Sequence, residues 1–295
     1  MILLEKIRRW TMYHIYWPIL CRFYAGRSKR FRLSNDLLFD YPMNGIIAGA
    51  LLADDFEKAE LRFVQSVLQA GDIVFDIGAN CGIYTIVAAK MVGSGGCVYS
   101  FEPSHREQEI LQHNIKLNHL SNVIVIGKAV SDMVGTSNLL ISTDGAMNSL
   151  AKNLHPAQHL IRSEEVETIS IDHFVQKYDI SRVDLVKIDV EGAEHRVFAG
   201  MRHLISSQSE VIVLFESAQA VASGFGYQVI DFLTQIRTLG LQLYYLDDMI
   251  LNKVEEDNPK IGREIYNFIA VKGNILLKRG CLPLDNDHLH LRLPL

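Results

Sequence analysis

Residues 74–85, VFDIGANCGIYT, place an acid, an asparagine and two glycines within seven positions after an apolar run. Gly78 allows a tight turn, and Gly82 lets the following helix approach closely. That helix would point free N–H groups at an anion, whereas Asp76 would attract an ammonium group. With Asn80 between the glycines, the spacing predicts a nucleotide-type ligand of mixed charge. S-adenosylmethionine, which carries an ammonium, a carboxylate and a sulfonium, has this character.

Two other nucleotide sites fit this segment less well. A phosphate-binding P-loop needs the pattern G-x-x-x-x-G-K-[ST], which the chain lacks. A dinucleotide site favours G-x-G-x-x-G with a pyrophosphate over the helix, and an acid inside the turn would repel that group. A structural turn beside a solvated acid is the remaining alternative.

A second acid closes the next β-rich run. Glu102, in SFEP, lies 26 residues after Asp76, which is the length of one strand–helix–strand unit. The two acids would then lie at neighbouring strand ends, where open α/β sheets bind ligands. The Glu102 carboxylate can accept hydrogen bonds from both ribose hydroxyls. Ser131, in GKAVSD after the third run, is expected beside the adenine.

The segment VKIDVEGAEH supplies the catalytic candidates. Group transfer from a sulfonium ligand of this kind would need an aligned acceptor and a residue that helps to remove the acceptor's proton. Strand alternation puts Lys187 and Asp189 on one face, so we expect Asp189 to orient or deprotonate the acceptor while Lys187 holds its charge in place. Glu191 and Glu216 are further catalytic candidates, although acids in first helical turns and at strand ends are common without any such role.

Three of these acids could also bind a metal. Asp189, Glu191 and Glu216 would offer the oxygen ligands that Mg2+ prefers. No dense ligand motif accompanies them. We therefore predict a site without a resident metal, with magnesium as the less favoured alternative.

A parallel sheet is needed to bring these side chains together. Beyond residue 55 the chain alternates helical patterns with seven β-rich runs: DIVFDIG, CVYSFEP, NVIVIGKAV, DLVKIDV, EVIVLFE, LQLYYLD and YNFIAV. Apolar strands joined by helices predict an α/β fold with a doubly wound, seven-stranded, mostly parallel sheet. SNLLIST and VETISI, within residues 135–170, predict a hairpin. We expect a basic, aromatic, helical N-terminal extension over 1–55, the main domain over 56–280 and a flexible tail over 281–295.

The motifs FDIGANCGIYT, YSFEP, KAVSD and above all DLVKIDVEGAEHRVFAGM resemble the FkbM family of S-adenosylmethionine-dependent methyltransferases. The resemblance covers residues 56–272. KIDVEGAE is its most specific part, and the first motif is shared by class I methyltransferases generally. The resemblance implies their Rossmann-like fold, with Asp76, Gly78, Asn80 and Gly82 in the cofactor loop and Glu102 on the ribose.

The resemblance also implies methyl transfer to a hydroxyl, typically of a sugar or a polyketide-like natural product. Alternatives are a non-catalytic binding module on the same fold, an N-methyltransferase, and a dinucleotide-dependent oxidoreductase. We expect the acceptor, a small molecule or sugar, to be selected by residues 1–55, 135–170 and 217–227. The polar candidates there are Asn148, Ser149, His155 and His159.

The net charge of -5 gives no reason to expect a nucleic-acid partner. Residues 1–33 carry eight Lys/Arg against Glu5, and their segment WTMYHIYWPILCRFY could contact a membrane surface or pack on the core. No early uncharged run reaches the roughly 20 residues of a membrane span. Four cysteines without C-x-x-C spacing favour a reduced, cytoplasmic protein, with peripheral contact at the inner face of a membrane as an option. No feature indicates an oligomeric state.

Overall fold

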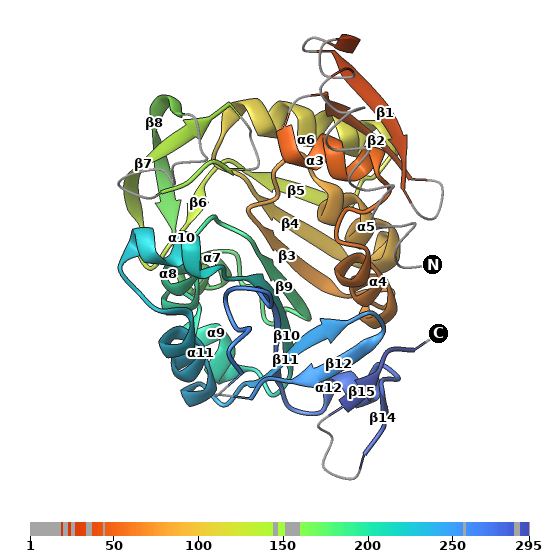
Figure 1. Cartoon of the computed structure of the whole chain (residues 1–295), viewed down its shortest axis with the longest axis vertical. Coiled ribbons are helices and arrows are strands. Elements are labelled where there is room, and N and C mark those ends of the chain that lie inside the picture. The colour runs from red at the N-terminus through yellow and green to blue at the C-terminus, as the bar shows by residue number, and fades with distance from the viewer. Residues whose placement is uncertain are drawn as a thin grey trace.

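The computed structural model describes residues 19, 23–24, 27–33, 37–43, 45–143, 147–150, 160–255, 258–285 and 290–294 (Figure 1). The helices are α3 (Gly45–Leu52), α4 (Lys58–Val67), α5 (Ile83–Val92), α6 (His105–Leu117), α7 (Ile171–Lys177), α8 (Glu194–Ala199), α9 (Arg202–Ser207), α10 (Gln219–Ala222), α11 (Val229–Thr238) and α12 (Ile275–Lys278). The strands are β1 (Ser28–Arg32), β2 (Leu38–Pro42), β3 (Ile73–Ile77), β4 (Cys97–Phe101), β5 (Val123–Ile126), β6 (Ala129–Val130), β7 (Gly135–Ser142), β8 (Leu160–Ile169), β9 (Leu185–Ile188), β10 (Val211–Glu216), β11 (Gln242–Asp247), β12 (Ile250–Lys253), β13 (Asn267–Lys272), β14 (Leu282–Pro283) and β15 (His290–Arg292).

Within the described residues, ten strands form the main sheet, in the order β14-β15-β12-β11-β13-β10-β9-β3-β4-β5. All seven predicted runs contribute a strand to it, which confirms the predicted fold class. The central strands β10, β9, β3, β4 and β5 are mutually parallel, and β13 runs antiparallel to both β10 and β11. The strand order reverses between β3 and β9, so the carboxyl ends of these two strands border the switch point where such sheets bind ligands.

The sheet is buried on both faces because its strands are apolar at nearly every position. Phe75 and Val186 belong to the core on one face. Val74 and Leu185 belong to the core on the other face, which α4 and α5 cover (Figure 1). Because side chains of a strand alternate between the two faces, Asp76 and Lys187 lie on the face beneath α4 and α5. Gly78 and Asp189, two positions further along, lie on the same face.

The described part of the N-terminal extension contains a β-hairpin as well as a helix. Strands β1 and β2 pair antiparallel beside α6, and α3 follows them (Figure 1). Phe39 and Tyr41 of β2 pack with Cys81 and Ile83 in a small core of their own. The helix was predicted from the sequence, and the hairpin was not. Most of the segment considered for membrane contact, including residues 1–18, lies outside the described residues.

The chain end is part of the sheet, which corrects the expectation of a flexible tail over 281–295. β15 pairs antiparallel with β12 and with β14. Cys281, Leu291 and Leu293 are buried there. Residues 288–293, HLHLRL, alternate polar and apolar side chains with the period of a strand, a signal that the expectation of a flexible tail overlooked. The wider division of the chain into three parts stays a prediction.

The predicted hairpin of residues 135–170 is confirmed. β7 pairs with β8 antiparallel, and the short β6 pairs with β8 in a separate three-stranded sheet. The run NVIVIGKAV is therefore two strands rather than one, because the chain leaves the main sheet after Ile126. Among the described residues, none of the helices has the length and apolar character required to cross a membrane.

Candidate active site

The loop between β3 and α5 packs closely against the backbone at the end of β9. Gly78 has φ +76°, and a Cβ atom there would lie 1.8 Å from the carbonyl oxygen of Asp189. Gly82 has φ +94°, and its Cβ would lie 2.4 Å from a methyl group of Leu111. Both glycines are thus required by close approach and by backbone conformation. Asn80 between them adopts the left-handed region at φ 50°.

Several N–H groups of this loop have partners inside the protein, which corrects the expectation of a bare amide cluster. Gly78 N and Ala79 N both donate to Phe101 O at 3.0 Å. Asn80 N donates to Glu102 Oε2 at 2.8 Å, and Cys81 N donates to Asn80 Oδ1 at 2.7 Å. In a tight turn the backbone amides point into the protein. The loop therefore offers a ligand fewer free N–H groups than its sequence suggested.

Glu102 is buried at the end of β4 and closes the other side of this loop. Besides Asn80 N, its carboxylate accepts Ser104 N at 2.9 Å. Each carboxylate oxygen has two lone pairs, so both oxygens can still accept a hydrogen bond from a hydroxyl group. Burial raises the pKa of Glu102 to about 8, with the nearby Glu107 charge adding to the effect.

Asp76 lies behind the loop, at 1% exposure. Its Oδ2 atom accepts a 2.6 Å hydrogen bond from Thr85 Oγ1, while Oδ1 is buried without a partner among the described residues. Burial raises the pKa of Asp76. An orphaned carboxylate oxygen is costly, and a cationic group brought nearby would relieve that cost. This fits a donor that carries an ammonium and a sulfonium.

A cavity that is partly open to solvent lies at the carboxyl ends of β3, β4 and β9. Residues 78–84 and Glu102 line one side, and Lys187 and Asp189 line its sheet end. The N-terminal extension and the segment just after it supply the apolar wall: Phe39, Tyr41, Ile47 and Phe56. Asn148, predicted as an acceptor contact, also lines the cavity. A few polar groups within apolar walls are usual for small-molecule sites.

Lys187 and Asp189 form the charged end of this cavity. Lys187 Nζ lies 3.1 Å from Asp189 Oδ2 and 5.0 Å from the ring centre of Tyr84. Burial alone would lower the pKa of Lys187, but the charges of Asp189, Asp76 and Glu57 outweigh it and raise that pKa. The predicted pairing of this lysine with Asp189 is therefore present, although its role in catalysis stays a prediction.

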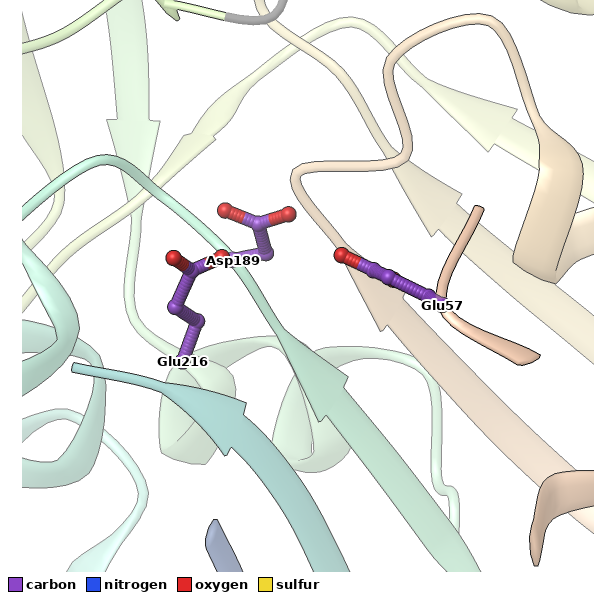
Figure 2. Close-up of side chains that lie close together, drawn as sticks. All are labelled: Glu57, Asp189 and Glu216. Carbon is purple, nitrogen blue, oxygen red and sulfur yellow. The ribbon is translucent and has the colours of Figure 1, made fainter. Parts of the chain in front are cut away.

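Three carboxylates converge beside the cavity (Figure 2). Oxygen atoms of Glu57, Asp189 and Glu216 all lie within 4.8 Å of one another, from the turn before α4 and the ends of β9 and β10. Burial, then the charge of Asp189, raises the pKa of Glu216 well above its ordinary value. Three carboxylates this close together could hold a cation, and the ammonium group of Lys187 is already paired with Asp189. Glu191 is not one of these three acids.

Sequence reasoning missed Glu57 and Tyr84. Tyr84 OH donates to Glu57 Oε2 at 2.6 Å, and burial raises the pKa of Glu57 to about 7. Glu57 has φ 37°, a conformation in which a glutamate is uncommon. The available signal was weak, since Glu57 is one of several acids before α4 and Tyr84 resembles an ordinary core residue of α5.

Four predicted catalytic or cofactor-binding residues are not among the described residues that line the cavity: Asp76, Ser131, Glu191 and Glu216. Ser131 is buried beyond β6, where its hydroxyl donates to Asp132 at 2.9 Å. Glu191 lies in the turn after β9, and its carbonyl accepts Ser149 Oγ at 2.8 Å. Glu194, the next acid, bonds Gly192 N and Tyr227 OH and so stabilises its own loop. His155 and His159 lie outside the described residues.

Buried acids should make the ligand-free protein less stable as the pH rises. The pKa of Glu102 is raised to about 8 and that of Glu194 to about 7, both above the 4.5 of an ordinary glutamate. The folded state therefore binds these protons more tightly, and their contribution is lost between about pH 5 and about pH 8. We expect the melting temperature to fall across this range. Glu102→Gln should flatten the dependence by up to about 1.4 kcal/mol per pH unit, and an unchanged slope would contradict the assignment.

Doubly wound sheets with acids at the ends of adjacent parallel strands and a glycine turn between them are those of class I, S-adenosylmethionine-dependent methyltransferases. The family model described as "Methyltransferase FkbM domain" matches residues 76–243, more than half of the chain. The chain therefore belongs to the FkbM methyltransferase family, as its motifs predicted.

The chain is also similar to several named proteins. The 31-O-demethyl-FK506 methyltransferase FkbM of Streptomyces tacrolimicus is 26% identical over 200 residues, which cover 55% of this chain and 75% of that protein. The hexuronic acid methyltransferase AglP of Haloferax volcanii is 23% identical over 167 residues, covering 53% and 61%. The crystal structure of methyltransferase FkbM from Methylobacillus flagellatus has a TM-score of 0.45 at 15% identity and covers 70% of this chain. The match spans about half of that solved chain, 47%.

Proposed function

We propose that this protein transfers the methyl group of S-adenosylmethionine to a hydroxyl of a small molecule, a sugar or a glycan-like acceptor. The observation that carries the proposal is a single cavity lined by Glu102 and the Gly78 loop at one side and by Asp189 at the other. When bound, the cofactor supplies an electrophilic methyl group. The residues of this chain then need only bind, orient and accept a proton.

The donor side of the cavity would be held by acids. Glu102 would accept the ribose hydroxyls, since its two oxygens are aligned by Asn80 N and Ser104 N. Asp76, with its orphaned oxygen, would favour the positive charges of the donor. Gly78, which has no side chain, keeps the turn close to β9.

The acceptor side would be held by Asp189 and its neighbours. Lys187 fixes the orientation of the Asp189 carboxylate through their ion pair, so this carboxylate can orient an acceptor hydroxyl and take its proton. Glu57, with a pKa of about 7, is a second proton acceptor suited to neutral pH. Polar ends and aromatic walls suit a hydroxylated acceptor, and two relatives act on a hexuronic acid and on a demethyl natural product.

Calorimetry with S-adenosylhomocysteine tests the donor side. We expect the wild type to bind this product and Glu102→Gln to bind it at least about tenfold more weakly, because the amide nitrogen of glutamine cannot accept a hydrogen bond and a buried group left without its partner costs about 1–3 kcal/mol. Glu194→Gln is the matched control, since Glu194 is also a buried acid that accepts backbone N–H groups but does not line the cavity. Absence of wild-type binding, or equal affinity of the two variants, would overturn the proposal.

A further inference from the structure

The N-terminal hairpin is joined to the main domain by two asparagines rather than by a strand. Asn118 Oδ1 accepts Leu38 N at 2.8 Å, and its Nδ2 donates to Leu38 O at 2.7 Å. Asn114 Oδ1 accepts Asp40 N at 2.8 Å, and its Nδ2 donates to Asp40 O at 3.1 Å. Each side-chain amide thus pairs with β2 as a neighbouring backbone would.

Helix and strand geometry explain the spacing. Four residues of an α-helix rise about 6 Å, and two residues of a strand rise about 6.6 Å. Asn114 and Asn118 are four apart, and Leu38 and Asp40 are two apart, so both pairs meet in register. Asp40 is held further by Arg30 and by His113, whose nitrogens lie 2.8 Å from its carboxylate. The hydrogen bond with Arg30 lowers the pKa of Asp40 to about 2 despite partial burial.

The two asparagines differ in their remaining hydrogen bond. Asn118 Nδ2 donates to Asn114 O at 2.7 Å, within α6. Asn114 Nδ2 donates instead to Cys81 O at 3.0 Å, in the loop that lines the cavity. Asn114 is fully buried, so this amide has no water to replace a lost partner.

We infer that Asn114 is a positioning residue that couples the seating of the N-terminal hairpin to the conformation of the cofactor loop. The side-chain amide of Asn114 contacts β2, the strand that carries the cavity-lining residues Phe39 and Tyr41. The same amide contacts Cys81, the residue after Asn80, whose N–H group is hydrogen-bonded to Glu102. Removal of this amide would therefore loosen both β2, with its aromatic residues, and the loop of residues 78–84. Loss of Asn118 loosens the hairpin alone.

Hydrogen–deuterium exchange of the ligand-free protein tests the coupling without any assumption about the cofactor. Asn114→Ala and Asn118→Ala are matched, because each removes two donated hydrogen bonds and one accepted bond. Both should speed exchange in β2. Only Asn114→Ala should speed exchange of residues 78–84, by about tenfold for the loss of a hydrogen bond worth about 1 kcal/mol or more. Should Asn114→Ala fail to fold, Asn114→Ser, which keeps a small polar group, takes its place.

A second readout rests on the proposed function. We expect S-adenosylhomocysteine to bind about tenfold more weakly to Asn114→Ala and within about twofold of wild type to Asn118→Ala. If the wild type binds no S-adenosylhomocysteine, the proposed function fails while the exchange result still decides the coupling. Equal exchange of residues 78–84 in the two variants would overturn the inference and leave Asn114 as a structural clamp.

Discussion

Asp189→Asn should abolish most methyl transfer while leaving S-adenosylhomocysteine affinity within about threefold of wild type. The substitution keeps the shape of the side chain and removes its ability to take a proton, and general-base catalysis contributes about 10²- to 10⁴-fold to rate. Turnover would be measured as label transferred from S-adenosylmethionine to acceptors in an extract of the source cells, with products identified by mass spectrometry. Affinity would be measured by calorimetry.

Glu194→Gln provides the comparison for this variant, since it removes another buried carboxylate on the segment after β9. That variant should retain turnover, because Glu194 bonds its own loop and Tyr227. Normal turnover by Asp189→Asn would refute the role of Asp189. A parallel loss of turnover and affinity would assign this carboxylate to binding instead.

Lys187→Met should destabilise the fold by about 3–5 kcal/mol at pH 8, as expected when one partner of a buried ion pair is removed. Lys187 is 7% exposed, and Asp189, Asp76 and Glu57 all act on its charge. Without the ammonium, these acids would repel one another in a poorly solvated space. Chemical denaturation gives the free energy of unfolding.

The pH dependence separates charge from packing in this variant. At about pH 5 the buried carboxyls with raised pKa values bind protons, so the loss of stability should shrink. Lys187→Arg, which keeps the charge, should be milder than Lys187→Met at pH 8. An equal loss at both pH values would show that the lysine stem, and not its charge, stabilises the site.

The parts of the site that the sequence could predict are those encoded by local spacing. Asp76, Gly78 and Glu102 each follow an apolar run, and the ends of parallel strands meet at one edge of the sheet. The alternation that puts Lys187 and Asp189 on one face is equally local. The identification of these residues therefore required only strand periodicity and turn chemistry.

The parts that the sequence could not predict depend on packing between distant segments. Glu57 precedes α4 and reaches Asp189 only because α4 lies over the sheet face that carries β9. Ser131 was expected at the cavity because β5 seemed to continue through GKAVSD, whereas the main-sheet strand ends at Ile126. Strand β1 carries Lys29, Arg30 and Arg32, so its sequence suggested a basic surface rather than a hairpin. The contacts that hold the hairpin in place include those of two asparagines on α6, which are distant in the sequence.

The apolar wall and Glu57 both precede residue 76, where the family match begins. A segment outside the matched region therefore supplies the apolar wall of the cavity, while the glycine loop, Glu102, Lys187 and Asp189 lie within that region. Under the proposed function, substitutions in residues 39–56 would change which acceptor fits the cavity without altering the residues proposed to hold the methyl donor. Because the two surfaces come from separate stretches of the chain, acceptor specificity could then evolve independently of donor binding.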